Sequence, residues 1–201
     1  MTTTHLPQDA SVLMTADGSI DLALNRPGHG SRVRLRRAWW GPDDDELVVG
    51  GLLEEFVADN RDWHVLHSVY VDALGADIDH LLLGPAGAVV VRDAYVPDMR
   101  VWAGGESFVA EGRRMDHLRQ TRTQERAVHR ILGEALGFAV PVTGLVVPVG
   151  ARDIVVGLPT PTLAVVAPRH ITHWLGCTPH RWAPRHSAGA YEVARRASTW
   201  A

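Results

Sequence analysis

Apolar residues recur with helical spacing just after the first forty residues. Leucine, valine and phenylalanine side chains between Leu47 and Val57 return about every 3.6 residues, which predicts an amphipathic helix over residues 44–59. Asp43–Asp45 precedes them, and carboxylates at a helix start cap free N–H groups and favour the helix dipole. Residues 1–43 lack such periodicity and are rich in Thr, Gly, Pro and Asp, so we interpret them as a partly irregular N-terminal extension.

The pattern then changes to that of strands. Residues 63–71 alternate apolar and polar positions, and residues 77–83 and 88–93 are short apolar runs separated by the turn Gly84–Gly87. Weaker alternation on both sides of Gly104–Gly105 predicts a hairpin of residues 100–103 and 107–110.

The second half of the chain alternates helices and strands. A long helical pattern covers residues 111–137 and stops at Gly137. Strand-like runs follow at 142–149, 153–156 and 163–166, then a short helix at 168–175 and a terminal amphipathic helix at 187–200. Strands that come both before and after a crossover helix predict a mixed β-sheet flanked by helices, an α/β fold. We expect the core domain to span 44–176, with 177–201 as a C-terminal tail and helix.

Charge narrows the possible partners. The net charge is −3, so no global positive field attracts nucleic acid. All 20 basic residues other than histidine are arginine, which excludes every mechanism that needs a lysine. Local patches remain: Arg32–Trp40 is basic and carries two tryptophans, and a second cluster lies near the C-terminus. That cluster comprises Arg181, Arg185, Arg195, Arg196, Trp182 and Trp200. Either patch could contact a nucleic-acid backbone or a protein partner.

The sequence favours a soluble, cytoplasmic protein. The single Cys177 excludes an intramolecular disulfide. The N-terminus lacks the basic start and apolar core of a signal peptide. The longest apolar runs are far shorter than the roughly 20 residues that a membrane helix needs, so we expect no membrane contact.

Residues 54–175 resemble the NERD (nuclease-related) domain. The specific matches are Ile78-Asp79-His80 and the turn Gly84-Pro85-Ala86-Gly87. Glu54-Glu55-Phe56-Val57 is similar to the family's first helix, and His173-Trp174-Leu175 to its closing helix. The resemblance implies a restriction-endonuclease-like core with a mixed central sheet.

The resemblance also implies a metal-dependent site. The family places an aspartate on the second strand, which Asp79 matches, and Glu-x-Lys on the third. Two carboxylates would hold Mg²⁺ or Mn²⁺ over a phosphate, and the lysine, two residues after the glutamate, would share its strand face. Here Arg92 stands at the glutamate position and Ala94 at the lysine position. Asp93 lies between them and should point to the opposite face.

A cation beside a divalent ion is repulsive but is attractive beside a bare carboxylate. We therefore hypothesise that the Arg92 guanidinium takes the metal's place, pairing with Asp79, bidentately if the geometry permits, and with Glu54 if that residue faces the site. A structure in which Asp79 holds a divalent ion while Arg92 points away would refute this. Either Gln120 or Gln124 resembles the glutamine on the family's following helix, and His80 fits a core or supporting histidine.

A second constellation has the spacing of a zinc site: His170, His173, Cys177 and His180. Gly176 and the surrounding prolines argue against it, because they interrupt the helix that would align His173 with Cys177.

Three functions remain open. The first is a catalytically degenerate nuclease-like domain that keeps a nucleic-acid or protein contact and needs no cofactor. The second is an active Mg²⁺- or Mn²⁺-dependent nuclease in which Asp79 works with a relocated carboxylate, namely Asp77, Asp93 or Glu106. The third is a protein-interaction module of a bacterial complex. The sequence does not indicate an oligomeric state.

Overall fold

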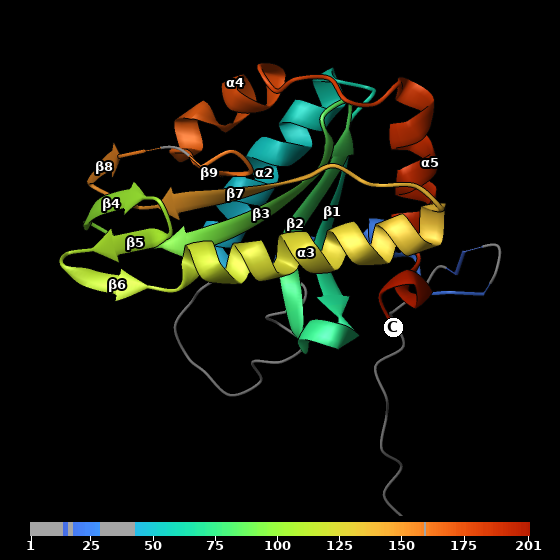
Figure 1. Cartoon of the computed structure of the whole chain (residues 1–201), viewed down its shortest axis with the longest axis horizontal. Coiled ribbons are helices and arrows are strands. Elements are labelled where there is room, and N and C mark those ends of the chain that lie inside the picture. The colour runs from blue at the N-terminus through green and yellow to red at the C-terminus, as the bar shows by residue number, and fades with distance from the viewer. Residues whose placement is uncertain (1–13, 16–17, 29–42, 159) are drawn as a thin grey trace, which may run out of the picture.

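The computed structural model describes residues 14–15, 18–28, 43–158 and 160–201 (Figure 1). Its centre is a five-stranded sheet in the order β1-β2-β3-β7-β9. The strands are β1 (His64–Val71), β2 (Ala76–Gly84), β3 (Gly87–Tyr95), β7 (Val142–Val149) and β9 (Leu163–Val165). β1, β2 and β3 form an antiparallel meander, whereas β3–β7 and β7–β9 are parallel. The predicted mixed sheet is confirmed, and it is consistent with a restriction-endonuclease-like core.

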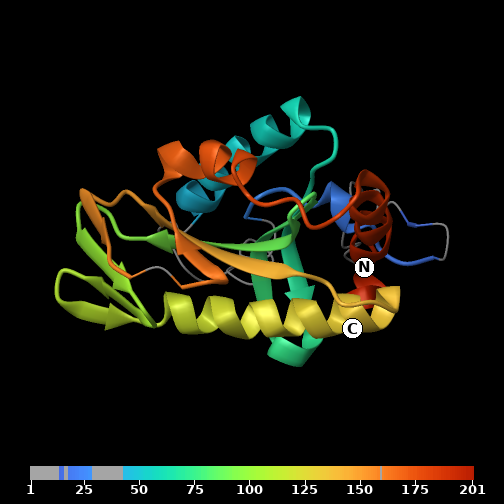
Figure 2. The same ribbon diagram turned by 45° about the horizontal axis from the view of Figure 1, so that its top comes forward.

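Helices cover both faces of this sheet (Figure 2). Successive residues of a strand point to opposite faces, so an apolar run such as Leu81–Leu83 contributes to two cores. Leu82 packs with α2 (Asp43–Asp59) and α4 (Ile171–Gly176) on one face. Leu81 and Leu83 pack with α3 (His117–Leu136) and α5 (Pro184–Ala194) on the other. We call these the α2 face and the α3 face.

A smaller sheet extends one end of the molecule, in the order β6-β5-β4-β8. Its strands are β4 (Arg100–Gly104), β5 (Ser107–Ala110), β6 (Arg113–Met115) and β8 (Asp153–Val156). The predicted hairpin at Gly104–Gly105 is confirmed, because Gly104 pairs with Ser107.

The long helix begins later than its sequence pattern predicts. Residues 113–115 form β6, and α3 starts at His117. Glu111 and Gly112 adopt positive φ angles of 44° and 77°, which turn the chain back on β5 so that Val109 pairs with Arg114. Pairing with β5 therefore outweighs the local helical tendency of these residues. The predicted stop is confirmed, since Gly137 is left-handed with φ 75°.

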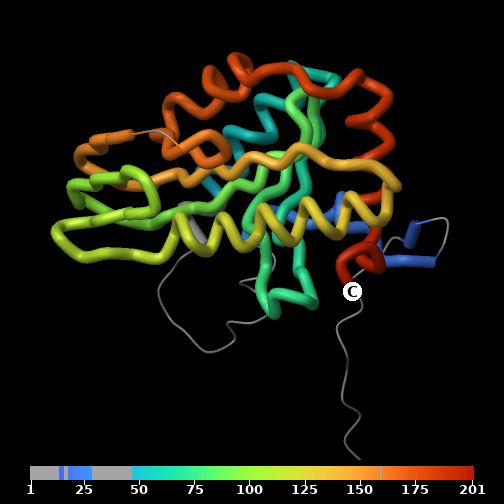
Figure 3. The backbone as a smooth tube through the Cα atoms, in the orientation of Figure 1, coloured from blue at the N-terminus to red at the C-terminus, as the bar shows by residue number. Residues whose placement is uncertain are grey.

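The C-terminal helix is also shorter than predicted. α5 begins at Pro184 and ends at Ala194, and a 3₁₀ turn covers Ala197–Trp200. The N-terminal segment pairs with the residues that follow this helix: the Leu22 N–H donates to the Arg195 carbonyl (2.7 Å), and the Ala197 N–H donates to the Ile20 carbonyl (3.0 Å). Figure 3 shows the two segments side by side. Residues 18–28 of the predicted extension thus pack on the domain, whereas Arg32–Trp40 lies outside the described residues.

Among the residues described, no helix has both the length and the apolarity needed to cross a membrane.

Candidate functional site

Strands β2 and β3 separate at Asp79. Their ladder runs from Gly84–Gly87 to His80–Val91 and stops there. Beyond that point β2 remains paired with β1 through Val71–Ala76, and β3 with β7 through Tyr95–Val149. The Asp79 carboxylate replaces a lost strand–strand hydrogen bond where the strands separate, because its Oδ2 accepts a hydrogen bond from the backbone N–H of Asp93 at 3.0 Å. A side chain therefore replaces a neighbouring strand as hydrogen-bond partner, and the central sheet opens.

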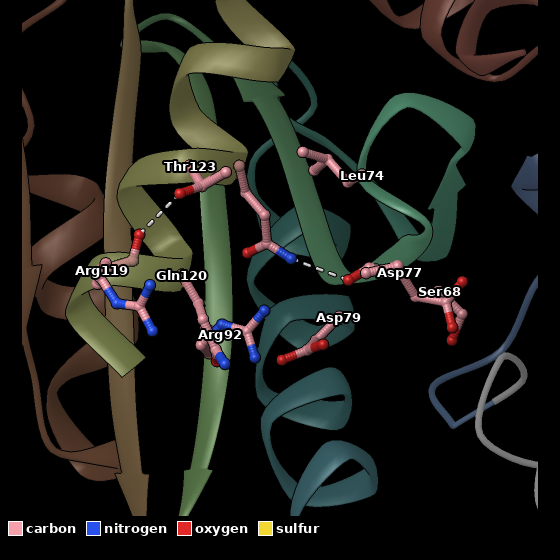
Figure 4. Close-up of a pocket in the computed structure, with 10 residues that line it drawn as sticks. Ser68, Leu74, Asp77, Asp79, Arg92, Arg119, Gln120 and Thr123 are labelled. Atoms are coloured by element: carbon pink, nitrogen blue, oxygen red, sulfur yellow. Dashed lines mark hydrogen bonds between the residues drawn. The ribbon is translucent and has the colours of Figure 1, made fainter. Parts of the chain in front are cut away.

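A pocket of about 380 Å³ lies in this opening (Figure 4). β2 contributes Asp77 and Asp79, β3 contributes Arg92, and α3 covers one side with Arg119, Gln120 and Gln124. Asp77 and Asp79 are two residues apart on one strand, which places both on the α3 face. The pocket thus brings together carboxylates, guanidinium groups and amides from three elements.

Arg92 shares this pocket with Asp79, as the strand pattern predicts. Figure 4 shows the two side chains directed into the same space. The two side chains do not form an ion pair within 4 Å in the described structure. Arg92 Nε is buried there without a hydrogen-bond partner. The direct pairing of Arg92 with Asp79 that we hypothesised, bidentate or not, is thus wrong for the described structure. The electrostatic attraction remains: burial raises the pKa of Asp79, and the Arg92 charge opposes that rise.

Both glutamines that the sequence singled out lie at the pocket. The buried Gln124 donates from Nε2 to the Asp77 carbonyl at 2.8 Å, which ties α3 to the free edge of β2. Gln120 lies one turn earlier and is exposed at the pocket. Gln124 therefore supports the pocket wall, while Gln120 is available to a ligand.

His80 and Glu54 lie on the opposite, α2 face of the sheet. His80 Nε2 is 2.9 Å from Asp93 Oδ2, and its Nδ1 is 2.7 Å from His67 Nδ1. His67 Nε2 lies 3.4 Å from Glu54 Oε1. Glu54 therefore faces His67 and not Arg92, which corrects the hypothesised Glu54–Arg92 contact. The result is a row of four polar side chains behind the pocket, connected to it through the Asp93 backbone.

Comparison with known proteins agrees with this architecture. The profile of the nuclease-related domain, NERD, matches residues 44–149, which is more than half of the chain. The chain belongs to the NERD family. No curated protein and no solved structure gave a significant match. The matched region runs from the start of α2 to the end of β7, so it contains β2, β3 and α3, the three elements that form the pocket.

The donors present do not fit the metal site that the NERD resemblance implies. Within the described ranges, no three His, Cys, Asp or Glu side chains converge as metal ligands do. Arg92 occupies the strand face where the family's glutamate is expected, and a guanidinium there repels a divalent ion. Ala94, at the lysine position, is fully buried among apolar side chains.

The three carboxylates considered as replacements lie in different places. Asp77 lines the pocket with Asp79. Asp93 directs its side chain to His80 on the α2 face, as predicted. Glu106 belongs to the β4–β5 turn and lies 3.9 Å from Arg122. Of these three, only Asp77 shares the pocket of this NERD domain.

The other candidate clusters are only partly assembled. In the zinc-like set, Cys177 Sγ lies 3.7 Å from His173 Nε2, and the described residues supply no third ligand. In the C-terminal cluster, Trp182 and Trp200 are buried. Arg195 is bound by Asp21 through Nε at 3.0 Å.

Sequence reasoning missed two features of the site. The first is His117 at the start of α3, which does not line the pocket but whose pKa is lowered by burial and then by the nearby Arg92 charge. The second is a row of arginines on α3, of which Arg119 reaches the pocket. The signal for the row was present, because Arg119, Arg122, Arg126 and Arg130 are three or four residues apart on a helix. Only the fold reveals that this helix borders the pocket.

Proposed function

We propose that this NERD domain is catalytically degenerate and binds nucleic acid at the Asp79–Arg92 pocket without cleaving it. The observation that carries the proposal is the place of Arg92. It lines the same pocket as Asp79, on the strand face where the family resemblance puts a metal-binding glutamate.

Electrostatics supports binding over hydrolysis. Metal-dependent hydrolysis needs anionic ligands around the ion, and Arg92 contributes a permanent positive charge at that position. Burial also raises the pKa of Asp79, which weakens this carboxylate as a ligand. An anionic phosphodiester is suited to the same surroundings, because Arg92 and Arg119 both line the pocket.

One observation favours an alternative. Asp77 and Asp79 both line the pocket, so an active Mg²⁺- or Mn²⁺-dependent nuclease could use this pair of carboxylates. Arg92 would then contact the phosphate in place of a lysine, although a guanidinium does not deprotonate and is a poor base.

Cleavage and binding assays on the purified full chain separate these functions. We expect no cleavage of plasmid or single-stranded DNA with Mg²⁺ or Mn²⁺, together with binding that weakens as salt increases. Divalent-dependent cleavage that disappears in Asp79→Ala would establish the alternative. A folded protein that neither binds nor cleaves DNA or RNA would also refute the proposal, leaving a protein-interaction module.

The role of Arg92 is tested by substitution. We expect Arg92→Ala to weaken DNA binding by about tenfold, the scale of one lost charged contact. Arg169→Ala is the matched control, since Arg169 is exposed on the 3₁₀ turn Pro168–His170 and does not line this pocket. Equal affinities of the two variants would show that the pocket does not bind the nucleic acid.

A further inference from the structure

A row of arginines follows the exposed side of α3. Arg119, Arg122, Arg126 and Arg130 are spaced by three, four and four residues, so they lie on one side of the helix. At about 1.5 Å per residue, the row covers roughly 16 Å along the axis. Arg114 of β6 extends it beyond the helix start. We call these five residues the arginine track.

The track leads to the pocket. A second hollow of about 270 Å³ lies between the β4–β5–β6 end of the molecule and α3. It is lined by Arg114, Arg119, Arg122 and Arg126. Arg119 also lines the Asp79–Arg92 pocket, and so does its neighbour Thr123. The two hollows therefore share a wall, and positive side chains continue from one into the other.

The carboxylates near the track compensate for only part of its charge. Arg119 binds Asp116 at 2.7 Å, Arg130 lies 3.3 Å from Glu134, and Arg122 lies 3.9 Å from Glu106. All three carboxylates are more than half exposed, and such exposed pairs contribute little and exchange readily. Arg114 and Arg126 have no carboxylate within 4 Å in the described part of the chain.

The positive charge of this surface is local. The whole chain carries a net charge of −3, so five arginines gathered on one helix and an adjoining strand contrast with the rest of the protein. Such a stripe attracts polyanions by releasing their counterions. A regular spacing of about 5–6 Å along a helix suits a polymer with repeated phosphates better than a single small anion.

We propose that the arginine track binds the phosphodiester backbone of a nucleic-acid strand and guides it to the Asp79–Arg92 pocket. This inference rests on the proposed function and adds a path to it. Contacts to the backbone carry little sequence information, so the track confers affinity and direction and not sequence specificity. The surface chemistry is the same for a single strand and for one strand of a duplex.

The test uses Arg114→Ala/Arg126→Ala in the full chain. Both side chains are exposed and lack a carboxylate partner in the described structure, so their loss should leave the fold intact. Arg61→Ala/Arg169→Ala is the matched control: it removes the same charge from two exposed arginines that line neither hollow and belong to neither basic patch. Thermal unfolding of both variants verifies folding.

Binding is measured on labelled single-stranded and duplex DNA of about 20 nucleotides, longer than a typical single-strand site. We expect the track variant to bind about tenfold or more weakly at low salt. The slope of the logarithm of the binding constant against the logarithm of the salt concentration should become less steep, because two phosphate contacts are lost. The expected decrease is about 1.4 for the single strand and about 1.8 for the duplex. The form whose slope decreases by the full amount expected for it is the form that follows the track.

The failure of this inference differs from the failure of the proposed function. If the wild type binds DNA and Arg92→Ala weakens binding, but the track variant matches its control, the pocket binds nucleic acid and the track does not. If the protein binds no nucleic acid, the proposed function fails as well. A third outcome is that the wild type binds an acidic protein but no DNA, and that the track variant binds this protein more weakly. That outcome would assign the surface to a protein partner and overturn the inference.

Discussion

His67 and His80 face each other through their Nδ1 atoms, 2.7 Å apart, in the interior of the α2 face. One of these nitrogens must donate and the other accept. His80 Nε2 lies 2.9 Å from a carboxylate oxygen of Asp93, so a neutral His80 carries its proton on Nε2 and accepts at Nδ1. The neutral His67 then donates from Nδ1, which leaves its Nε2 unprotonated. This assignment agrees with the absence of a hydrogen bond to His67 Nε2 within the described structure.

This arrangement predicts acid sensitivity. Burial, followed by the adjacent His80, lowers the pKa of His67 to about 3. Between pH 6.5 and 3 the unfolded chain binds a proton that the folded chain does not, so stability decreases as the pH falls. We expect this group to remove up to about 1.4 kcal/mol per pH unit below about pH 6. Urea unfolding of the wild type and His67→Gln from pH 7 to 4 should show the two free energies converging at low pH. Parallel curves would contradict the prediction.

Glu125 predicts that the stability of the fold changes with pH in the opposite direction. It is buried between α3 and β7, and burial raises its pKa to about 7. Between pH 4.5 and 7 the folded chain holds a proton that the unfolded chain has released, so this group lowers stability as the pH rises. We expect Glu125→Gln to increase the free energy of unfolding by up to about 3 kcal/mol at pH 8 and by little at pH 4. An equal effect at both values would show that packing, and not ionisation, is responsible.

The close approach of Glu125 to β7 leaves no room for a side chain at Gly144. A Cβ at Gly144 would lie 2.1 Å from Glu125 Oε1, 2.6 Å from Leu163 Cδ1 and 2.7 Å from Thr121 Cγ2. We expect Gly144→Ala to lower the free energy of unfolding by about 1–3 kcal/mol, the usual cost of overpacking. Gly51→Ala is the control: its Cβ meets nothing within 4 Å, and alanine in a helix should stabilise by about 1 kcal/mol. Chemical denaturation of both variants tests the contrast.

The ion pair of Asp21 with Arg195 joins the two ends of the described chain. The Asp21 carboxylate accepts from Arg195 Nε at 3.0 Å and from the Ala23 N–H at 3.0 Å, and the Arg195 hydrogen bond lowers its pKa. We expect Asp21→Asn to lower the free energy of unfolding by about 1–3 kcal/mol, because this carboxylate is buried and bonded. Glu134→Gln, which breaks the exposed pair with Arg130, should change it by less than about 0.5 kcal/mol. Similar losses in the two variants would mean that the Asp21 pair acts as an ordinary surface contact.

The sharing of strand faces follows from the local order of residues in the chain. The turn at Gly84–Gly87 sets the register of β2 and β3. Continuing that register places Asp79 opposite Arg92, on the same face of the sheet. Asp93 then points to the other face. Helix α2 and the two main hairpins were equally predictable, because their signals are apolar spacings and turn residues within a few positions of one another. The NERD resemblance rests on the same local features.

The contacts between these elements, in contrast, depend on long-range packing. The separation of β2 from β3 at Asp79, the contact of Glu54 with His67, and the approach of the α3 arginines to the pocket all join residues distant in sequence. The late start of α3 has the same origin, since residues 113–115 gain strand partners in β5 that no local pattern records. Local spacing specifies an element and its faces, whereas the packing of several elements specifies which faces meet, and the candidate site exists only where they do.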